Sequence, residues 1–159
     1  MIVVSNASPL IALSLIGRLE LLPALYGEIH IARAIHSEVV TRGRGRAGAA
    51  ILRKSDWLVT HSVSRRALAS FRPRPAGLHS GEVDTIALAV QLHADFVLID
   101  ERLARKFAES KGLQVLGTLG ILKYARSRKM LLDLRAVLND LRSKGFRFTD
   151  ELYEQILSG

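Results

Sequence analysis

The residues best suited to chemistry in this chain are short polar and acidic side chains that follow apolar, strand-like runs. Asn6 and Ser8 come after the apolar residues 2–4, and Asp100 and Glu101 come after the apolar residues 96–99. Oxygen ligands of this kind suit hard divalent cations such as Mg²⁺ or Mn²⁺, and clustered carboxylates repel one another without a cation among them. A metal ion held there can polarise a phosphodiester and supply a hydroxide. These residue types therefore favour metal-dependent hydrolysis of phosphodiesters.

Three more acids are candidates for the same site. Glu82 and Asp84 lie in the first turns of a strongly predicted helix, and Glu38 lies beside an apolar helical stripe. Each acid also has a structural interpretation: Glu82 complements the helix dipole, a contribution under about 1 kcal/mol, and Asp100 caps the next helix. Glu38 is then a solvated residue and Asp84 the partner of a surface arginine. Because Glu82 and Asp84 are two positions apart on a helix, roughly 200° around its axis, they cannot both point into one site.

The elements that must position these residues alternate between strands and helices. Strands are predicted at residues 2–4, 28–31, 57–63, 96–99 and 113–116, and helices at 8–17, 18–26, 33–41, 49–54, 80–93, 101–111 and from 118 onward. This alternation predicts an α/β fold with a mostly parallel five-stranded sheet flanked by helices. In such sheets, sites form at the carboxyl ends of the strands. If the first and fourth strands are neighbours, Asn6 and Asp100 emerge side by side.

Two further local features are predicted from turn and cap chemistry. Residues 64–77 contain two prolines and four arginines, which indicates a mobile loop. Ser80 and Thr149 are predicted to cap the helices that follow them.

Length and composition limit the class of protein. A chain of 159 residues, 48% of them hydrophobic, is expected to form one domain with its own core. It lacks an apolar run of about 18 residues, so neither a membrane span nor an ordinary signal peptide is expected. It also lacks cysteine, which excludes disulfides and thiolate metal sites. We expect a cytoplasmic protein without a membrane partner.

The net charge indicates the kind of partner. Lysine and arginine outnumber the acids by 23 to 15, giving a net charge of +8, which attracts polyanions such as nucleic acid. A basic protein that is merely soluble is the alternative. Two arginine-rich loops are candidates for phosphate contacts, or else carry solvated charges. Their residues are Arg42, Arg44 and Arg46 in the first loop, and Arg65, Arg66, Arg72 and Arg74 in the second.

Several segments together resemble a known family. "VVSNASPLIAL", "IHSEVV", "SGEVDTIALA" and "DFVLIDERLARKFAESKGLQVLGTLGIL", with the terminal "GFRFTDELYEQIL", are similar to PIN domains. The closest likeness is to the compact prokaryotic group of nucleic-acid-binding PIN proteins, which often act as toxins of toxin–antitoxin pairs. The resemblance implies a single three-layer domain over residues 1–159, with the helices from about 118 packing on the same core. It also implies a Mg²⁺- or Mn²⁺-dependent ribonuclease, with RNA or another nucleic acid as substrate, a small antitoxin as partner, and a homodimer.

The resemblance also implies which residues form the site. The family's acidic tetrad falls on Asn6, Glu38, Glu82 and Asp100, as catalytic residues and metal ligands. Ser8 and Glu101 match assisting positions, and Asp84 is a lesser candidate. Asn6 departs from the family because most PIN domains have Asp there. An amide oxygen can still ligate a metal ion, but it brings no charge.

Two other functions fit parts of the sequence. A catalytically weak or silent module that binds nucleic acid or an antitoxin would explain Asn6. A phosphatase of the haloacid-dehalogenase type also places acids after the first strand, but it needs a nucleophilic Asp where this chain has Asn6.

Overall fold

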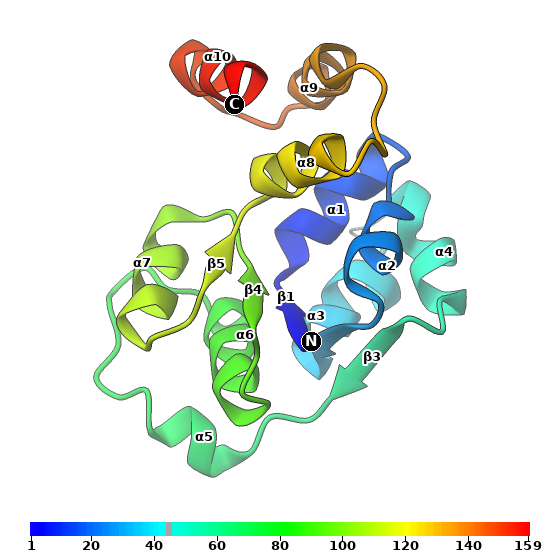
Figure 1. Ribbon diagram of the computed structural model, residues 1–159. Coiled ribbons are helices and arrows are strands. Elements are labelled where there is room, and N and C mark those ends of the chain that lie inside the picture. The colour runs from blue at the N-terminus through cyan, green and yellow to red at the C-terminus, as the bar shows by residue number, and fades with distance from the viewer. Residues whose placement is uncertain (44–45) are drawn as a thin grey trace.

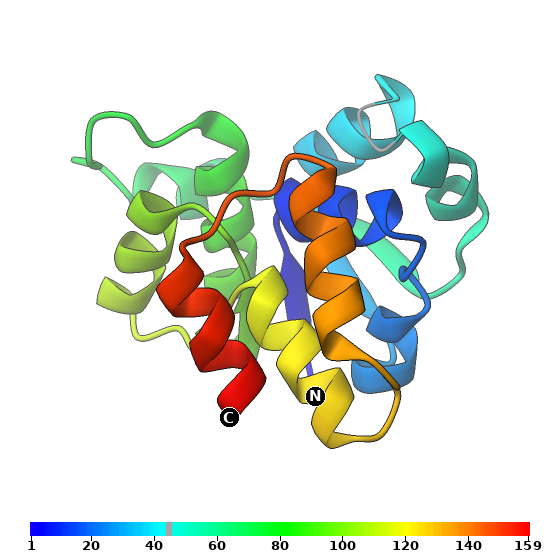
Figure 2. The same cartoon turned by 90° about the horizontal axis from the view of Figure 1, so that it is seen from above.

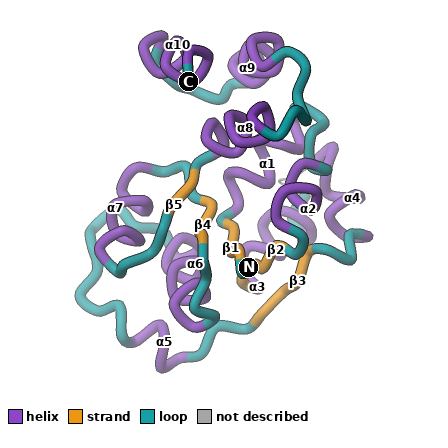
Figure 3. Tube along the Cα trace, viewed as in Figure 1, coloured by secondary structure: helices purple, strands orange, loops and turns teal. Residues whose placement is uncertain are grey.

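Five short strands form a parallel sheet at the centre of the molecule (Figures 1 and 3). The computed structural model describes residues 1–43 and 46–159, so the predicted phosphate contact Arg44 lies outside the described residues. The strands are β1 (Val3–Ser5), β2 (Ile29–Ala32), β3 (Leu58–His61), β4 (Phe96–Leu98) and β5 (Val115–Leu116). Their order is β3-β2-β1-β4-β5, and each neighbouring pair is parallel. The predicted α/β class is confirmed, with a sheet that is parallel throughout its described strands.

Helices flank this sheet on both sides. They are α1 (Ala7–Leu15), α2 (Leu21–Tyr26), α3 (Arg33–His36), η1 (Ser37–Thr41), η2 (Arg46–Gly48), α4 (Ala49–Lys54), α5 (Arg65–Ala69), α6 (Ser80–Gln91), α7 (Arg102–Ser110), α8 (Thr118–Ser127), α9 (Leu134–Ser143) and α10 (Asp150–Ser158). The chain crosses the sheet in opposite directions before β2 and before β4, so right-handed crossovers place these connecting helices on opposite faces. In the described ranges, no helix is long and apolar enough to cross a membrane.

The core explains why these short strands form at all. Both faces of a parallel sheet are covered, so its central strands are apolar without alternation. Val3 and Val4 in β1, and Val97 and Leu98 in β4, are completely buried. Helix α6 packs on β1, β2 and β4, which is why its apolar residues occupy most of its circumference. A helix packed on three strands therefore leads directly into β4 and its carboxyl end.

The structure corrects the prediction of a mobile loop at residues 64–77. The segment begins with α5, because the Ser64 hydroxyl caps the helix by accepting a hydrogen bond from the Ala67 N–H at 3.1 Å. Phe71, just beyond α5, is buried and meets Phe107 edge-on with ring centroids 5.9 Å apart. The prolines come only after this anchor, so they do not prevent the helix.

Two predicted helix features also differ. The segment predicted as one helix at 33–41 is a turn of α-helix, α3, followed by a π-helical turn, η1. The residue before α6 that takes the N-cap position is His79 rather than Ser80. By contrast, the predicted cap at Thr149 is confirmed, because its hydroxyl accepts a hydrogen bond from the Leu152 N–H at 3.1 Å.

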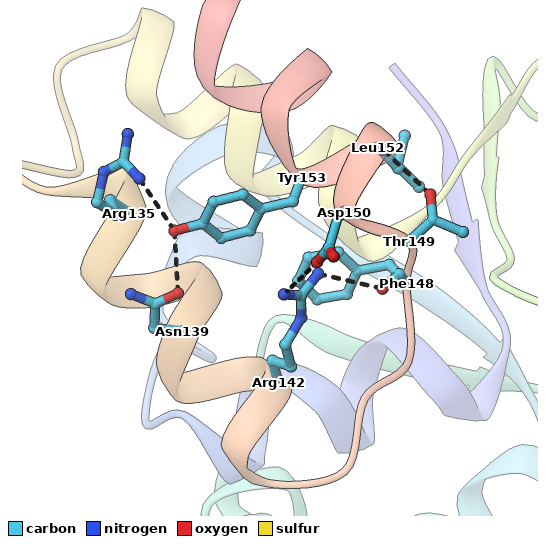
Figure 4. A network of polar contacts seen from close by, with 8 residues as sticks. All are labelled: Arg135, Asn139, Arg142, Phe148, Thr149, Asp150, Leu152 and Tyr153. Carbon is cyan, nitrogen blue, oxygen red and sulfur yellow. Dashed lines mark hydrogen bonds and ion pairs between the residues drawn. The ribbon is translucent and has the colours of Figure 1, made fainter.

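The C-terminal helices α8, α9 and α10 lie side by side (Figure 2). Arg142 joins α9 to α10: its guanidinium stacks 4.4 Å from the ring centre of Phe148 and 5.0 Å from that of Tyr153 (Figure 4). The same group pairs with Asp150 at 3.0 Å and donates to the Phe148 carbonyl at 3.2 Å. These contacts fix the connection at residues 145–149, which borders the site described next.

Candidate functional site

The order of the strands brings the ends of β1 and β4 together. Ser5 pairs with Leu98, and the backbone N–H of Asn6 donates to the Leu98 carbonyl at 2.9 Å. Asn6 and Asp100 therefore leave the same edge of the sheet from neighbouring strands, as the sequence predicts.

A hollow of about 830 Å³ opens at this edge, and we call it the first hollow. Its polar lining includes residues that follow β1 and β4 and residues of α1, η1 and α6. The predicted site residues among them are Asn6, Ser8, Glu38, Glu82 and Glu101, and the other polar lining residues are Arg42, His79, Ser80 and Lys144. Three carboxylates and one amide, far apart in the sequence, thus share one cavity.

Gly81 lies where α3 and η1 approach the start of α6. A Cβ atom added to Gly81 would lie 3.3 Å from Ile35 Cδ1, which is tight, and 3.8 Å from Glu38 Oε2, which is an ordinary contact. The absence of a side chain therefore eases the packing of Ile35 on α6, next to the point where Glu38 and Glu82 line the same cavity. Glu82 is 7% exposed, and its Oε2 accepts a long hydrogen bond of 3.4 Å from the His79 N–H.

Asp100 is held differently from the other acids. It does not appear among the described residues that line the first hollow, but it borders a second hollow beside it. Its carboxylate accepts hydrogen bonds from the Ser8 hydroxyl at 2.9 Å and from the Thr118 hydroxyl and N–H, both at 2.7 Å. Asp100 thus ties the start of α1 to the start of α8, directly beside Glu101.

The amide of Asn6 faces the hollow with its NH₂ group. Nδ2 donates to Glu101 Oε2 at 3.2 Å, while Oδ1 accepts from the Thr85 hydroxyl at 3.3 Å. Thr85 also has the Gly81 carbonyl within 2.9 Å. In this orientation the side chain donates to a carboxylate, and its carbonyl oxygen points away from that carboxylate.

The electrostatics of the hollow are visible at Glu101. Burial of its carboxyl raises its pKa above the ordinary glutamate value, and the negative charges of Asp100 and Glu82 raise it further. Hydrogen bonds from its own backbone N–H and from Asn6 act in the opposite direction. Negative charge is therefore concentrated at this edge of the sheet, and a cation would relieve it.

Of the remaining predicted residues, some line the hollows and others do not. Asp84 does not appear in the described lining of either hollow; burial raises the pKa of its carboxyl, and the charge of Arg74 lowers it. Arg42 lines the first hollow. Arg46, Arg72 and Arg74 are exposed, and none of them appears in the described lining of either hollow.

The sequence reasoning missed several residues at the site. Thr118 follows β5, so the strand-end rule that selected Asn6 and Asp100 also applies to it. Thr85 is three residues after Glu82 on the same helix face. Three arginines of the second hollow, Arg102, Arg105 and Arg147, come from segments that only the fold brings together.

The donor set suits a hard divalent cation in its chemistry. Glu38, Glu82 and Glu101 offer carboxylate oxygens around one cavity, and Asn6 offers an amide. Within residues 1–43 and 46–159, however, no three acidic or histidine side chains already converge as a ready metal cluster.

Comparison with known proteins gives one result. Residues 2–159 match the family model described as PIN domain, whereas no curated protein and no solved structure matches the chain. PIN domains are typically nucleases, and these nucleases generally use divalent metal ions. The match spans nearly all of the sequence, and the parallel five-stranded sheet is the fold expected of it. The chain belongs to the PIN-domain family.

Proposed function

We propose that this protein is a divalent-metal-dependent endoribonuclease that acts as the toxin of a toxin–antitoxin pair. The observation that carries the proposal is the convergence of three glutamates and Asn6 on one hollow at the carboxyl edge of the sheet. Family membership and the net charge of +8 support a polyanionic substrate.

Glu38, Glu82 and Glu101 are the residues that would hold Mg²⁺ or Mn²⁺, with Asp100 and Asn6 beside them. The chemistry supplied by such an ion would be the activation of water and the stabilisation of the charge that develops on the phosphate. Asn6 can join the ligands only after its amide turns over, because its NH₂ group now faces Glu101.

Residues beside the first hollow position these groups. Asp100 keeps Ser8 and Thr118 in place through three hydrogen bonds, so α1 and α8 stay fixed relative to β4. Arg42, at the rim of the first hollow, is placed to bind a phosphate next to the acids.

Two carboxylates on α6 offer a matched test. Glu82→Gln and Asp84→Asn each replace a carboxylate by an amide two positions apart, but only Glu82 lines the first hollow. With a labelled single-stranded RNA and Mg²⁺ or Mn²⁺, we expect Glu82→Gln to lose about a hundredfold in cleavage rate. Asp84→Asn should stay close to wild type. Equal rates for wild type and Glu82→Gln would contradict the proposal, and the same assay with DNA tests the choice of RNA.

A silent binding module is the second candidate. It is favoured by the uncharged Asn6 and by the lack, among the described residues, of a ready metal cluster. This candidate becomes the better account if wild type binds RNA but cleaves nothing with either metal.

The partner and the assembly are part of the same proposal. Co-expression with the product of a small adjacent reading frame should yield a stable complex that no longer cleaves RNA. Light scattering of the purified chain should give the mass of a homodimer.

A further inference from the structure

The second hollow, which the proposed nuclease chemistry does not use, is lined by several cations. Its volume is about 760 Å³, and Arg102, Arg105 and Arg147 are its basic lining residues. It shares Glu101, Gly145 and Phe146 with the first hollow. The two cavities are therefore neighbours, with Glu101 at their common border.

The arginines of the second hollow are available to a ligand. Within the described part of the chain, neither Arg102 nor Arg147 forms a salt bridge, and both are exposed. Arg105 donates to the Ile99 carbonyl at 3.3 Å, which leaves further N–H groups of its guanidinium. The nearby Asp100 is already bound by Ser8 and Thr118.

Phe146, at the border of the two hollows, differs from Phe148 in its ring contacts. Phe148 contacts two side chains: the Arg142 guanidinium, 4.4 Å from its ring centre, and the Tyr153 ring, which is stacked at 12° with its centroid 6.2 Å away. Phe146 is partly exposed and lines both hollows, and its recorded ring contact is a tilted one with Phe148 at 6.2 Å. Both rings pack against the hydrophobic core and line the second hollow, but only Phe146 also lines the first.

We propose that the second hollow binds the phosphates of an RNA strand whose scissile bond lies in the first hollow, and that Phe146 stacks on a base between them. This inference rests on the proposed function, because it assumes RNA as the substrate. Guanidinium groups bind phosphate oxygens with two parallel hydrogen bonds, and aromatic rings stack on bases of any sequence. Arg42, which lines the first hollow, gives the strand a further cation there.

The arginines can be tested by binding without metal. The probe is a short fluorescent single-stranded RNA, titrated in EDTA over a series of salt concentrations. Arg102→Ala combined with Arg147→Ala should weaken binding and reduce the slope of log K against log salt by about 1.4, two phosphates at about 0.7 each. The control, Arg53→Ala with Lys54→Ala, removes the same charge from exposed positions of α4 outside both hollows and should change the slope far less. An unchanged slope in the first variant, or an equal loss in the control, overturns the proposal.

Phe146 is tested in the same titration. Phe146→Leu keeps an apolar side chain but removes the aromatic face, so affinity should fall about tenfold. Phe146→Tyr should restore it, with thermal unfolding of both variants showing that the fold is kept. Equal binding by Phe146→Leu and wild type overturns the stacking role.

Cleavage assays on the same preparations separate this inference from the proposed function. If wild type binds RNA with the arginine-dependent slope but cleaves nothing with Mg²⁺ or Mn²⁺, the nuclease proposal fails and the proposal for the second hollow stands. If wild type cleaves RNA, and the Arg102/Arg147 variant binds and cleaves it equally well, the proposal for the second hollow fails and the nuclease proposal stands. If wild type does not bind RNA at all, both fail.

Discussion

Asn6 can be accommodated in two orientations, and Thr85 is the reason. The Thr85 hydroxyl carries one proton and has two acceptors in reach, Asn6 Oδ1 at 3.3 Å and the Gly81 carbonyl at 2.9 Å. If the amide turns over, the hydroxyl can donate to Gly81 and accept from Asn6 Nδ2. The amide therefore keeps a partner on α6 in both orientations, while presenting either its NH₂ group or its oxygen to Glu101.

An Asn6→Asp substitution should have opposite effects with and without metal. Metal affinity at oxygen sites rises with ligand charge, so Mn²⁺ should bind more tightly in a calorimetric titration. Without metal, in EDTA, Glu101 loses the hydrogen bond that the Asn6 NH₂ group donates to it. The new carboxylate is also buried, together with that of Glu82. We expect the free energy of unfolding in urea to fall by about 2 kcal/mol.

Asn139→Asp is the control for this experiment, because it adds the same charge on an exposed position of α9. It should change neither quantity appreciably. Equal Mn²⁺ affinities for wild type and Asn6→Asp would mean that Asn6 is only a turn residue.

Among the elements, β2 and β3 carry a pair of histidines that makes their pairing sensitive to pH. His30 Nδ1 and His61 Nε2 are 2.8 Å apart, so one ring must be neutral to accept the hydrogen bond. Burial lowers the pKa of His30, the charge of His61 lowers it further, and Glu28 raises it. The folded protein thus binds this proton more weakly than the unfolded chain does.

Stability should therefore fall as the solution is acidified. The contribution of His30 is complete above its unfolded-state pKa, near 6.5, and is lost as pH falls through the lower folded-state pKa. Urea unfolding between pH 7 and 5 should show this decline, and His30→Gln should reduce it. His93→Asn, at an exposed position with positive φ that Asn tolerates, should leave the decline unchanged. A decline that is identical in all three proteins would refute the assignment to His30.

Elements with a strong local signal were predictable, and contacts between distant segments were not. Apolar runs predict the strands β1 and β4, so the sequence places Asn6 and Asp100 at one edge of the sheet. Helix α5 was missed because its cap, Ser64, precedes a segment whose arginines and prolines dominate the pattern. Asp100 was expected to share the pocket of Glu38 and Glu82, but Thr118, eighteen residues later, draws its carboxylate toward α8. Arg102 and Arg147 line the same hollow only because α10 packs against α8.

For the whole molecule, the C-terminal helices determine whether both hollows have a complete wall. Arg142→Ala removes two cation–π contacts, an ion pair and a hydrogen bond at once, and should lower the stability of α9 and α10 by about 1–2 kcal/mol. Hydrogen exchange should quicken in these helices while α6 keeps its protection. Arg135→Ala is the matched control, because that guanidinium lies 5.8 Å from the Tyr153 ring and donates a long 3.4 Å bond to its hydroxyl. The prediction fails if both variants behave alike or if α6 is affected equally.

Because Phe146 lines the first hollow, the hollow can form only late in the synthesis of the chain. About 140 residues separate Asn6 from Phe146, although both line the first hollow. During synthesis at about 5–20 residues per second, roughly ten seconds pass between the emergence of the two. A nascent chain thus carries Asn6, Glu38, Glu82 and Glu101 for seconds before the cavity around them is closed. The first hollow can therefore be complete only after residue 146 has left the ribosome.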